Sequence, residues 1–101
     1  IPDNVDLVLS HGPASGYGDA CRSGARAGCP HLLRELQTRV RPAVHVFGHI
    51  HSGYGVTSDG STCFVNASTC TSDYAPTNPP VVFDLRKTEA GWAVEFVQTS
   101  T

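Results

Sequence analysis

The sequence has no methionine, a single tryptophan and no apolar run that approaches the roughly 20 residues needed to span a bilayer. It also lacks any concentration of positive charge, because its seven Lys and Arg residues are scattered and its formal net charge is −2. We therefore expect neither a membrane nor a nucleic-acid polymer as a partner. Nothing in the sequence resembles a signal peptide, which favours a cytoplasmic location.

The length permits one small domain or a piece of a larger one. Forty per cent of the 101 residues are hydrophobic, so a core is possible. A chain of this length buries only roughly 60–70% of the surface that its unfolded form exposes, so its stability is marginal if one face lacks a partner. The chain begins at Ile1-Pro2-Asp3 and enters an apolar stretch almost at once. We expect it to be a piece of a larger domain.

The four cysteines lack the C-x-x-C spacing of a zinc knuckle. Cys21 and Cys29 lie eight residues apart, and Cys63 and Cys70 lie seven apart. An even number of cysteines also suits a small secreted domain with disulfides. We expect free, partly buried thiols and keep a zinc- or disulfide-stabilised domain as the alternative.

Hydrophobic periodicity predicts one helix, over residues 30–40. Pro30 suits the first helical turn, and Pro42 ends the helix just beyond Arg41. The apolar residues that recur at helical spacing are Leu32, Leu33, Leu36 and Val40.

Short apolar runs predict strands before and after this helix. A long loop rich in Gly, Ser and Ala precedes the helix, and a polar, Pro-rich loop comes before the last two strands. The order is therefore β, loop, α, β and then several short strands, which is an α/β pattern. The strands are expected at residues 5–9, 43–47, 62–65, 81–85 and 92–97, the loops at 14–28 and 72–80, and turns at 53–55, 58–60 and 89–91.

Three of the five histidines follow apolar strands at the point where each strand ends. His11 follows the first strand, and His49 and His51 follow the second. Ligand sites of open α/β sheets gather at the carboxyl ends of strands, and neutral imidazole binds Mn, Fe, Zn and Ni. If the backbone there is extended, the rings of His49 and His51 project to one side and Ile50 points the other way. The pattern favours a metal site over histidines that only hydrogen-bond to nearby backbone.

Ser10-His11-Gly12-Pro13 and Gly48-His49-Ile50-His51 resemble the fourth and fifth sequence blocks of the calcineurin-like metallophosphoesterase superfamily. The resemblance narrows to one subfamily, the metallophosphoesterase domain-containing proteins related to fetal brain protein, and covers nearly the whole chain. The residues that narrow it are Gly28-Cys29 with Leu32-Leu33, residues 45–51, Gly53-Tyr54-Gly55, Asp59-Gly60, Val65-Asn66-Ala67-Ser68, Tyr74, Asn78-Pro79-Pro80 and Asp84-Leu85.

The resemblance implies a fold and a ligand set. The fold is α/β, the C-terminal half of a two-sheet β-sandwich flanked by helices, and residues 1–101 are the C-terminal portion of a single domain whose N-terminal half is absent. His11 and His49 are implied as ligands of a second metal and His51 as a ligand of the first. Two divalent ions are implied as cofactors, with manganese expected first and iron or zinc as alternatives.

The same resemblance implies hydrolysis of small-molecule phosphoesters, most of all phosphodiesters such as cyclic nucleotides. In such sites two ions, roughly 3.5–4 Å apart, bind phosphate oxygens and a hydroxide that attacks phosphorus in line. His49 is implied as a catalytic residue as well, because an imidazole there can help to protonate the leaving alkoxide.

Three other motifs of the superfamily are absent from this sequence: an early D-x-H, a G-D-x-x-D and a G-N-H-[DE]. No Asp-x-His and no Gly-Asn pair occurs anywhere in it. We therefore expect the isolated chain to have little or no turnover, since no residue in it replaces the bridging carboxylate. The alternative function is a truncated, non-catalytic metal- or nucleotide-binding module. The sequence does not indicate an oligomeric state.

Several further residues have two possible roles. His45, inside a strand, is expected to be packed or to support the metal ligands, and His31 in the first helical turn to face solvent. Asn66 begins an N-glycosylation pattern, but we expect its amide to hold a loop near the site instead.

Tyr54 and Gly53 are predicted to bind substrate. Tyr54 and Tyr74 could each stack on a nucleobase or simply fill the base of a loop. Gly53 and Gly55 are also expected to allow tight backbone geometry behind the metal site. Asp73 is expected to be a solvated loop carboxylate rather than a metal ligand.

Overall fold

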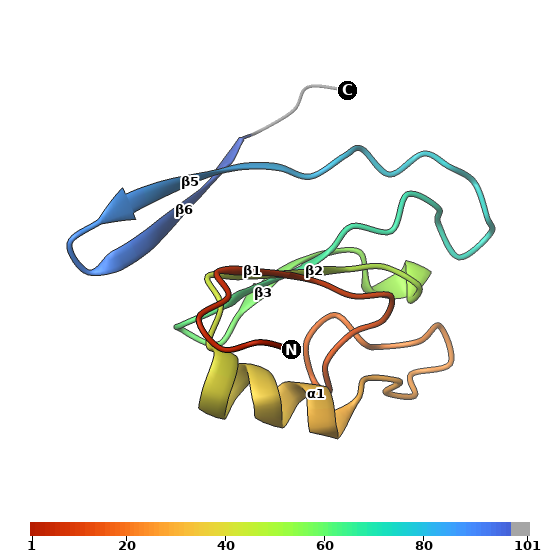
Figure 1. Ribbon diagram of the computed structural model, residues 1–101. Helices are drawn as coiled ribbons and strands as arrows, with labels where there is room; N and C mark the ends of the chain where they lie inside the picture. Colours follow the sequence, from red (N-terminus) through yellow and green to blue (C-terminus); the bar gives the residue numbers. More distant parts are fainter. Residues whose placement is uncertain (98–101) are drawn as a thin grey trace.

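The computed structural model describes residues 1–97 and contains a four-stranded sheet, a two-stranded hairpin and one main helical segment (Figure 1). The sheet has the order β1-β2-β4-β3, in which β1, β2 and β4 are parallel and β3 is antiparallel to β4. Its strands are β1 (Leu7–Leu9), β2 (Val44–Phe47), β3 (Gly55–Ser58) and β4 (Cys63–Asn66), and the hairpin pairs β5 (Val82–Thr88) with β6 (Gly91–Val97).

Five of these six strands lie where the sequence predicts them, and β3 is the exception. A glycine-rich turn was expected at residues 53–55, whereas Gly55 already begins the strand and pairs with Asn66 of β4. Val56 is the only large apolar residue of this edge strand, and it is 44% exposed. The strand is therefore stabilised by its backbone hydrogen bonds with β4, and no hydrophobic pattern in the sequence predicts it.

The predicted helix over residues 30–40 is confirmed, but its second half is wider than an α-helix. α1 (Pro30–Glu35) continues as a π-helical stretch (Leu36–Val40), whose last bond runs from the Arg41 amide to the Leu36 carbonyl at 2.9 Å. The Cys29 sulfur accepts a hydrogen bond from the Leu32 amide at the start. Arg41 is left-handed, with φ 46°, and the following proline prevents further helix.

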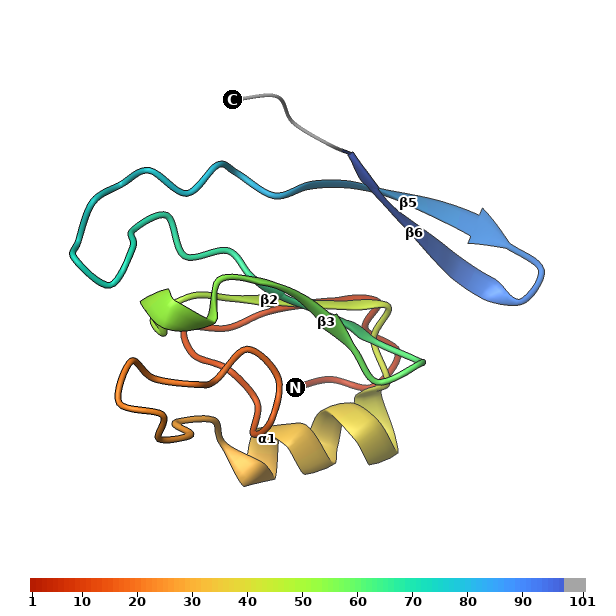
Figure 2. The ribbon, with the colours of Figure 1, turned by 180° about the vertical axis from the view of Figure 1, so that it is seen from behind.

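One face of the sheet packs against the helical segment and forms the core. Val8, Phe47 and Phe64 from the strands meet Leu36 and Val40 from the helical segment, and all five are at most 7% exposed. Figure 2 shows the β5–β6 hairpin on the other side of the sheet. The α/β class is therefore confirmed, whereas the two-sheet sandwich stays a prediction.

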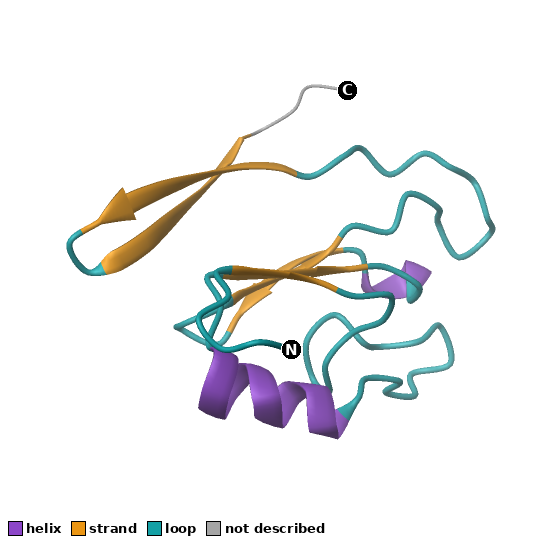
Figure 3. Ribbon diagram, in the orientation of Figure 1, coloured by secondary structure: helices purple, strands orange, loops and turns teal. Residues whose placement is uncertain are grey.

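The connections from β1 to α1 and from β4 to β5 are long compared with the strands, whereas the turn between β5 and β6 is short (Figure 3). Both predicted long loops are confirmed, one between β1 and α1 and one between β4 and β5. None of the helices within residues 1–97 is long and apolar enough to cross a bilayer.

All four cysteines are free thiols, as predicted. Cys21, Cys63 and Cys70 are partly buried, whereas Cys29 is exposed at the start of α1. The described part of the chain therefore does not depend on a cystine cross-link.

Candidate metal centre

Two of the predicted ligands meet where neighbouring parallel strands end. His11 lies two residues beyond β1, and His49 lies two residues beyond β2. The carboxyl ends of paired parallel strands fall at the same edge of a sheet, so the two histidines come together. Their ring centroids lie 4.6 Å apart, with the ring planes tilted by 39°.

Backbone hydrogen bonds fix this meeting point. The Ser10 amide donates to the Val46 carbonyl at 3.0 Å, which extends the β1–β2 ladder by one residue. The Gly48 amide then donates to the His11 carbonyl, also at 3.0 Å. The two segments that carry the histidines are thus bonded to each other directly, so the ring pair does not depend on side-chain packing alone.

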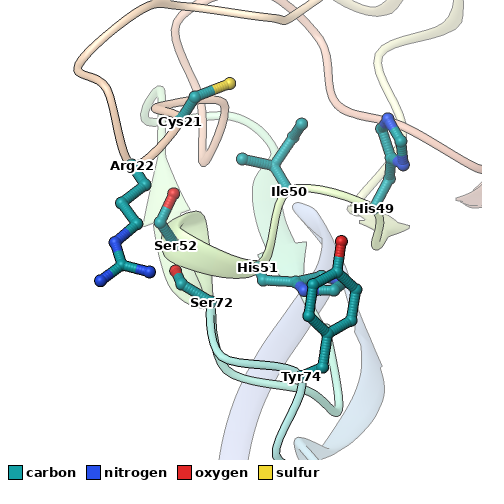
Figure 4. A pocket seen from close by; sticks show the side chains of 8 residues that line it. All are labelled: Cys21, Arg22, His49, Ile50, His51, Ser52, Ser72 and Tyr74. Carbon is teal, nitrogen blue, oxygen red and sulfur yellow. The ribbon is translucent and has the colours of Figure 1, made fainter.

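His51 lies on the same side of the molecule as His49, along one cavity of about 360 Å³ (Figure 4). Its ring meets Tyr74 edge-on, with centroids 5.2 Å apart and planes at 85°. His11 is not among the residues that line this cavity, which are Cys21, Arg22, His49, Ile50, His51, Ser52, Ser72 and Tyr74.

The backbone through His49 and His51 is not extended, so the condition for both rings to project to one side by strand alternation is not met. His49 has φ +74°, in the left-handed region, and His51 begins a short 3-10 turn, His51–Gly53. The Ile50 carbonyl accepts a bond from the Gly53 amide at 3.0 Å, which curls the chain instead of extending it. The two imidazoles still reach one cavity, because the turn brings them there rather than strand alternation. Ile50 is 7% exposed and also lines that cavity, so it does not simply point away.

Asn66, at the end of β4, stabilises this turn through side-chain hydrogen bonds. Its Nδ2 donates to the Ile50 carbonyl at 2.7 Å and to the Gly18 carbonyl at 3.0 Å. Its Oδ1 accepts from the Ser68 amide at 3.1 Å and from the Ser68 hydroxyl at 2.6 Å. The side chain is fully buried, and all its hydrogen-bonding capacity on both atoms is used. The prediction that this amide holds a loop near the site is confirmed.

Gly53 closes the same turn against the long loop. A Cβ on Gly53 would lie 2.2 Å from the Gly18 carbonyl oxygen and 2.9 Å from Nδ2 of Asn66. The predicted tight backbone geometry is therefore confirmed at Gly53. Its separate role in substrate binding stays a prediction.

The two candidate stacking tyrosines differ in their surroundings. The Tyr54 hydroxyl donates to the Pro79 carbonyl at 2.6 Å, so this half-buried ring anchors the loop before β5. Tyr74 is 78% exposed, has φ 61° and lies beside His51 at the cavity. Asp73 faces solvent and pairs with Arg22 at 3.2 Å, as expected of a solvated carboxylate. Tyr54 as a substrate-binding residue stays a prediction.

Asp19 organises the long loop that reaches the cavity. Its buried carboxylate accepts hydrogen bonds from the amides of Gly16 and Gly28 and from the Arg26 guanidinium at 2.7 Å. Burial opposes ionisation, but these donors outweigh it and hold the pKa of the Asp19 carboxyl below its usual range. Ser52 ties the same loop to the histidine turn, because its hydroxyl donates to the Ala20 carbonyl at 2.6 Å.

Curated proteins support the resemblance seen in the sequence. Metallophosphoesterase domain-containing protein 1 of Homo sapiens is 54% identical over 86 residues, which cover 84% of this chain and 26% of the human protein. The Mus musculus protein of the same name matches equally well. The chain is similar to the metallophosphoesterase domain-containing proteins.

The match falls in the C-terminal part of these relatives, and the chain spans about a quarter of their length. A UPF0046 protein of Caenorhabditis elegans is 49% identical over 85 residues, which cover 84% of this chain and 22% of that protein. No protein-family model matches the sequence.

The metals that this family implies can be tested against the donors of the chain. Among residues 1–97, no three His, Cys, Asp or Glu side chains lie close enough together to hold an ion. His11, His49 and His51 therefore do not form a single three-residue ligand group, and the predicted division of these histidines between two ions does not require one. His11 and His49 fit a divalent cation as a pair of imidazoles, and His51 lies on the cavity that His49 also lines. Within residues 1–97, no carboxylate lines that cavity.

Sequence reasoning missed three other residues of the cavity. Arg22 brings a guanidinium to it, and Ser52 and Ser72 bring hydroxyls. Arg22 belongs to the Gly- and Ser-rich loop, where no periodicity indicates a direction for any side chain. Only the folded path of the loop, fixed by Asp19, brings it to His49 and His51.

His45 is packed inside the four-stranded sheet, as predicted, and His31 faces solvent. His45 is 0% exposed and lies between Phe47, at 4.9 Å between ring centroids, and Phe64, at 5.9 Å. Its Nε2 lies 2.7 Å from the Ser10 hydroxyl. Burial lowers the pKa of the His45 imidazole from 6.5 to about 4.

This buried imidazole predicts acid sensitivity in a defined window. Between pH 6.5 and about 4 the unfolded chain binds a proton at His45 that the folded chain does not. Stability is then fully present above pH 6.5 and is lost as the pH falls toward 4, by about 3 kcal/mol in total. Urea unfolding followed by circular dichroism at successive pH values measures this loss.

The control for this window is His45→Gln, which cannot take up the proton. Its unfolding free energy should depend less steeply on pH between 6.5 and 4 than that of the parent chain. Asp19 does not interfere, because a carboxyl whose pKa is depressed loses its contribution only below that window. Equal slopes in parent and variant would contradict the assignment to His45.

Proposed function

We propose that this chain provides the late histidine ligands of a two-metal phosphoesterase site, with residues 1–101 forming the C-terminal portion of a single domain. The observation that carries the proposal is the pairing of His11 with His49 where two parallel strands end, with their ring centroids 4.6 Å apart. Similarity to the relatives adds the reaction class, since they are named for a metallophosphoesterase domain.

The roles of the histidines follow from their places. His11 and His49 would hold one divalent ion, and His51 would contribute to a second one beside the cavity. Two such ions, when bound, supply Lewis-acid activation of water and neutralise charge on the phosphoryl oxygens. Manganese is the first choice, and iron and zinc are also compatible with imidazole ligands. His49 would in addition deliver a proton to the leaving group.

The cavity suits a small phosphodiester such as a cyclic nucleotide. Arg22 offers a guanidinium, which binds phosphate oxygens in a bidentate manner. Tyr74 offers an exposed ring, on which a nucleobase can stack. The two side chains line the same cavity as His49 and His51, so one ligand can meet all four.

Calorimetric titration with manganese tests this proposal. We expect the chain to bind the ion weakly at one site, because two imidazoles without carboxylates make an incomplete ligand set. Replacing both His49 and His51 by alanine should abolish that binding. His31→Ala is the matched control, since this exposed histidine lies on α1 and binding should persist. Equal binding by the parent and the double variant would contradict the histidine assignment.

A second candidate function is a non-catalytic module that binds metal or nucleotide without turnover. It is favoured by the lining of the cavity, in which the described part of the chain places no carboxylate to bridge two ions. Hydrolysis of a phosphodiester by the isolated chain distinguishes the two functions. A robust rate that His51→Ala abolishes would favour the enzyme, whereas metal binding without any rate would favour the module or a site that other residues complete.

A further inference from the structure

A buried side-chain pair lies directly behind the turn that carries His11. His45 is fully buried in β2, and its Nε2 lies 2.7 Å from the hydroxyl of Ser10. The same hydroxyl donates to the Gly12 carbonyl at 2.8 Å. Ser10 and Gly12 stand on either side of His11, so this hydroxyl closes a small turn around the histidine.

The ring contact alone leaves the tautomer of His45 open, and the bond from Ser10 to Gly12 indicates which one is present. A serine hydroxyl has one hydrogen, and Ser10 gives it to the Gly12 carbonyl. The contact with His45 must then use a hydrogen of the ring, which places the proton on Nε2 and leaves Nδ1 bare. Nδ1 of His45 is the one buried side-chain nitrogen or oxygen within residues 1–97 that lacks a partner.

The unpartnered nitrogen shows what the histidine contributes at this position. A leucine or methionine could fill the space between Phe47 and Phe64 without burying an unpaired acceptor. Only a polar side chain can donate to the Ser10 hydroxyl from inside the core. The hydrogen bond, and not the packing volume, is therefore what distinguishes His45 from an apolar residue.

Within residues 1–97, no backbone hydrogen bond reaches Gly12 in the turn around His11, whereas the Pro13 carbonyl that follows it accepts from the Cys29 amide at 3.0 Å. The Ser10 amide and the His11 carbonyl are bonded to the β2 segment, to Val46 and Gly48. The Gly12 carbonyl is held by the Ser10 hydroxyl, and that hydroxyl is held in place by His45. The Gly12 carbonyl is thus linked to β2 through the side chains of Ser10 and His45.

We propose that His45 is a positioning residue, which acts through the Ser10 hydroxyl to hold His11 against His49. The inference rests on the proposed function, in which His11 and His49 are metal ligands. His45 itself touches neither the metal nor the substrate. Its contribution is to keep the His11 turn in one conformation, so that the imidazole pair is arranged before an ion arrives.

Two matched pairs of variants separate the hydrogen bonds from the packing. Ser10→Thr keeps the hydroxyl, and Ser10→Val has nearly the same shape without it. His45→Gln keeps an N–H near the position of Nε2, and His45→Met fills similar volume without a donor. Manganese affinity should fall about 10-fold or more in the Val and Met variants and change far less in the Thr and Gln variants.

A second readout does not depend on any metal. Imidazole nitrogen shifts in NMR should show His45 with its proton on Nε2 in the parent chain and in Ser10→Thr. Exchange of the Gly48 amide, which donates to the His11 carbonyl, should be faster in Ser10→Val than in Ser10→Thr. The free energy of unfolding of each variant, measured in urea, shows whether a difference in amide exchange is local to the turn or reflects a change in global stability.

The outcomes distinguish this inference from the proposed function. Faster exchange and weaker manganese binding in Val and Met, with rescue in Thr and Gln, support the inference. Faster exchange without manganese binding in any chain, parent included, supports the role of His45 in the turn and contradicts the metal site. Equal tautomer, exchange and affinity in the Thr and Val variants would overturn the inference, even if the parent binds manganese well.

Discussion

Asn66→Asp should destabilise the fold by about 3–5 kcal/mol at pH 7, one of the two largest effects that we expect. The substitution conserves shape and changes a single group, the amide that donates to the carbonyls of Ile50 and Gly18. A carboxylate oxygen there would face two carbonyl oxygens in a fully buried place. Both carbonyls would lose their donor, and a negative charge would be left without a partner among them.

The effect should depend on pH with a recognisable sign. A protonated carboxyl can donate to one of the two carbonyls, so the folded variant holds its proton more tightly than the unfolded chain does. Stability gained in this way is present below the unfolded value of about 4 and is lost as the pH rises. Relative to the parent at each pH, the variant should therefore be less destabilised at pH 4 than at pH 7.

Asn78→Asp is the matched control for this substitution. Its Nδ2 also donates to two carbonyls, those of Ser68 and Cys70, but the residue is only partly buried. Water can solvate the new carboxylate there, so we expect a clearly smaller loss. Denaturant unfolding followed by circular dichroism compares the two. Similar losses at both positions would show that burial of the Asn66 amide is not what matters.

Among the elements that form the core, apolar residues that face it allow their positions to be predicted from the sequence. The strand β2 is apolar apart from His45, and the helical segment repeats its apolar residues, so both could be located to within a residue or two. β3 has no such pattern, because its residues lie at the edge of the sheet and face solvent. The π-helical stretch Leu36–Val40 also could not be predicted, since apolar spacing does not distinguish it from an α-helix.

The candidate site shows a similar division. That His11 and His49 meet follows from the rule that parallel strands end at the same edge, and this rule needs only the sequence pattern. The course of the chain from His49 to His51 could not be predicted, because a left-handed residue outside glycine depends on tertiary contacts. Those contacts come from Asn66 and Gly18, which are distant in sequence.

Arg22 marks the limit of prediction from the sequence. It lies in a loop without hydrophobic periodicity, and its place at the cavity depends on the hydrogen bonds of Asp19 and on the bond from Ser52 to Ala20. Each of these is a single polar contact between residues that no local pattern pairs. The sequence pattern therefore accounts for the meeting of His11 and His49 but not for the loop beside them, and their role as metal ligands stays a prediction.

Gly53→Ala should be as damaging as any change at Asn66, with a loss of about 3 kcal/mol or more. The added Cβ would lie 2.2 Å from the Gly18 carbonyl oxygen, which is far inside van der Waals contact. That oxygen belongs to backbone, so a change of side-chain rotamer cannot relieve the clash. The turn and the long loop must move apart, which also stretches the Asn66 hydrogen bond to Gly18.

Gly12→Ala is the control, because a Cβ on Gly12 has no atom within 4 Å and the backbone there is not left-handed. Its unfolding free energy should stay within about 1 kcal/mol of the parent value. Loss of stability in Gly53→Ala should be accompanied by faster amide exchange around Gly18, on the other side of the contact. A stable Gly53→Ala chain with unchanged exchange would mean that the long loop does not rest on the His51–Gly53 turn. That outcome would contradict the inference that Asn66 and Gly53 together hold in place the turn beside the cavity.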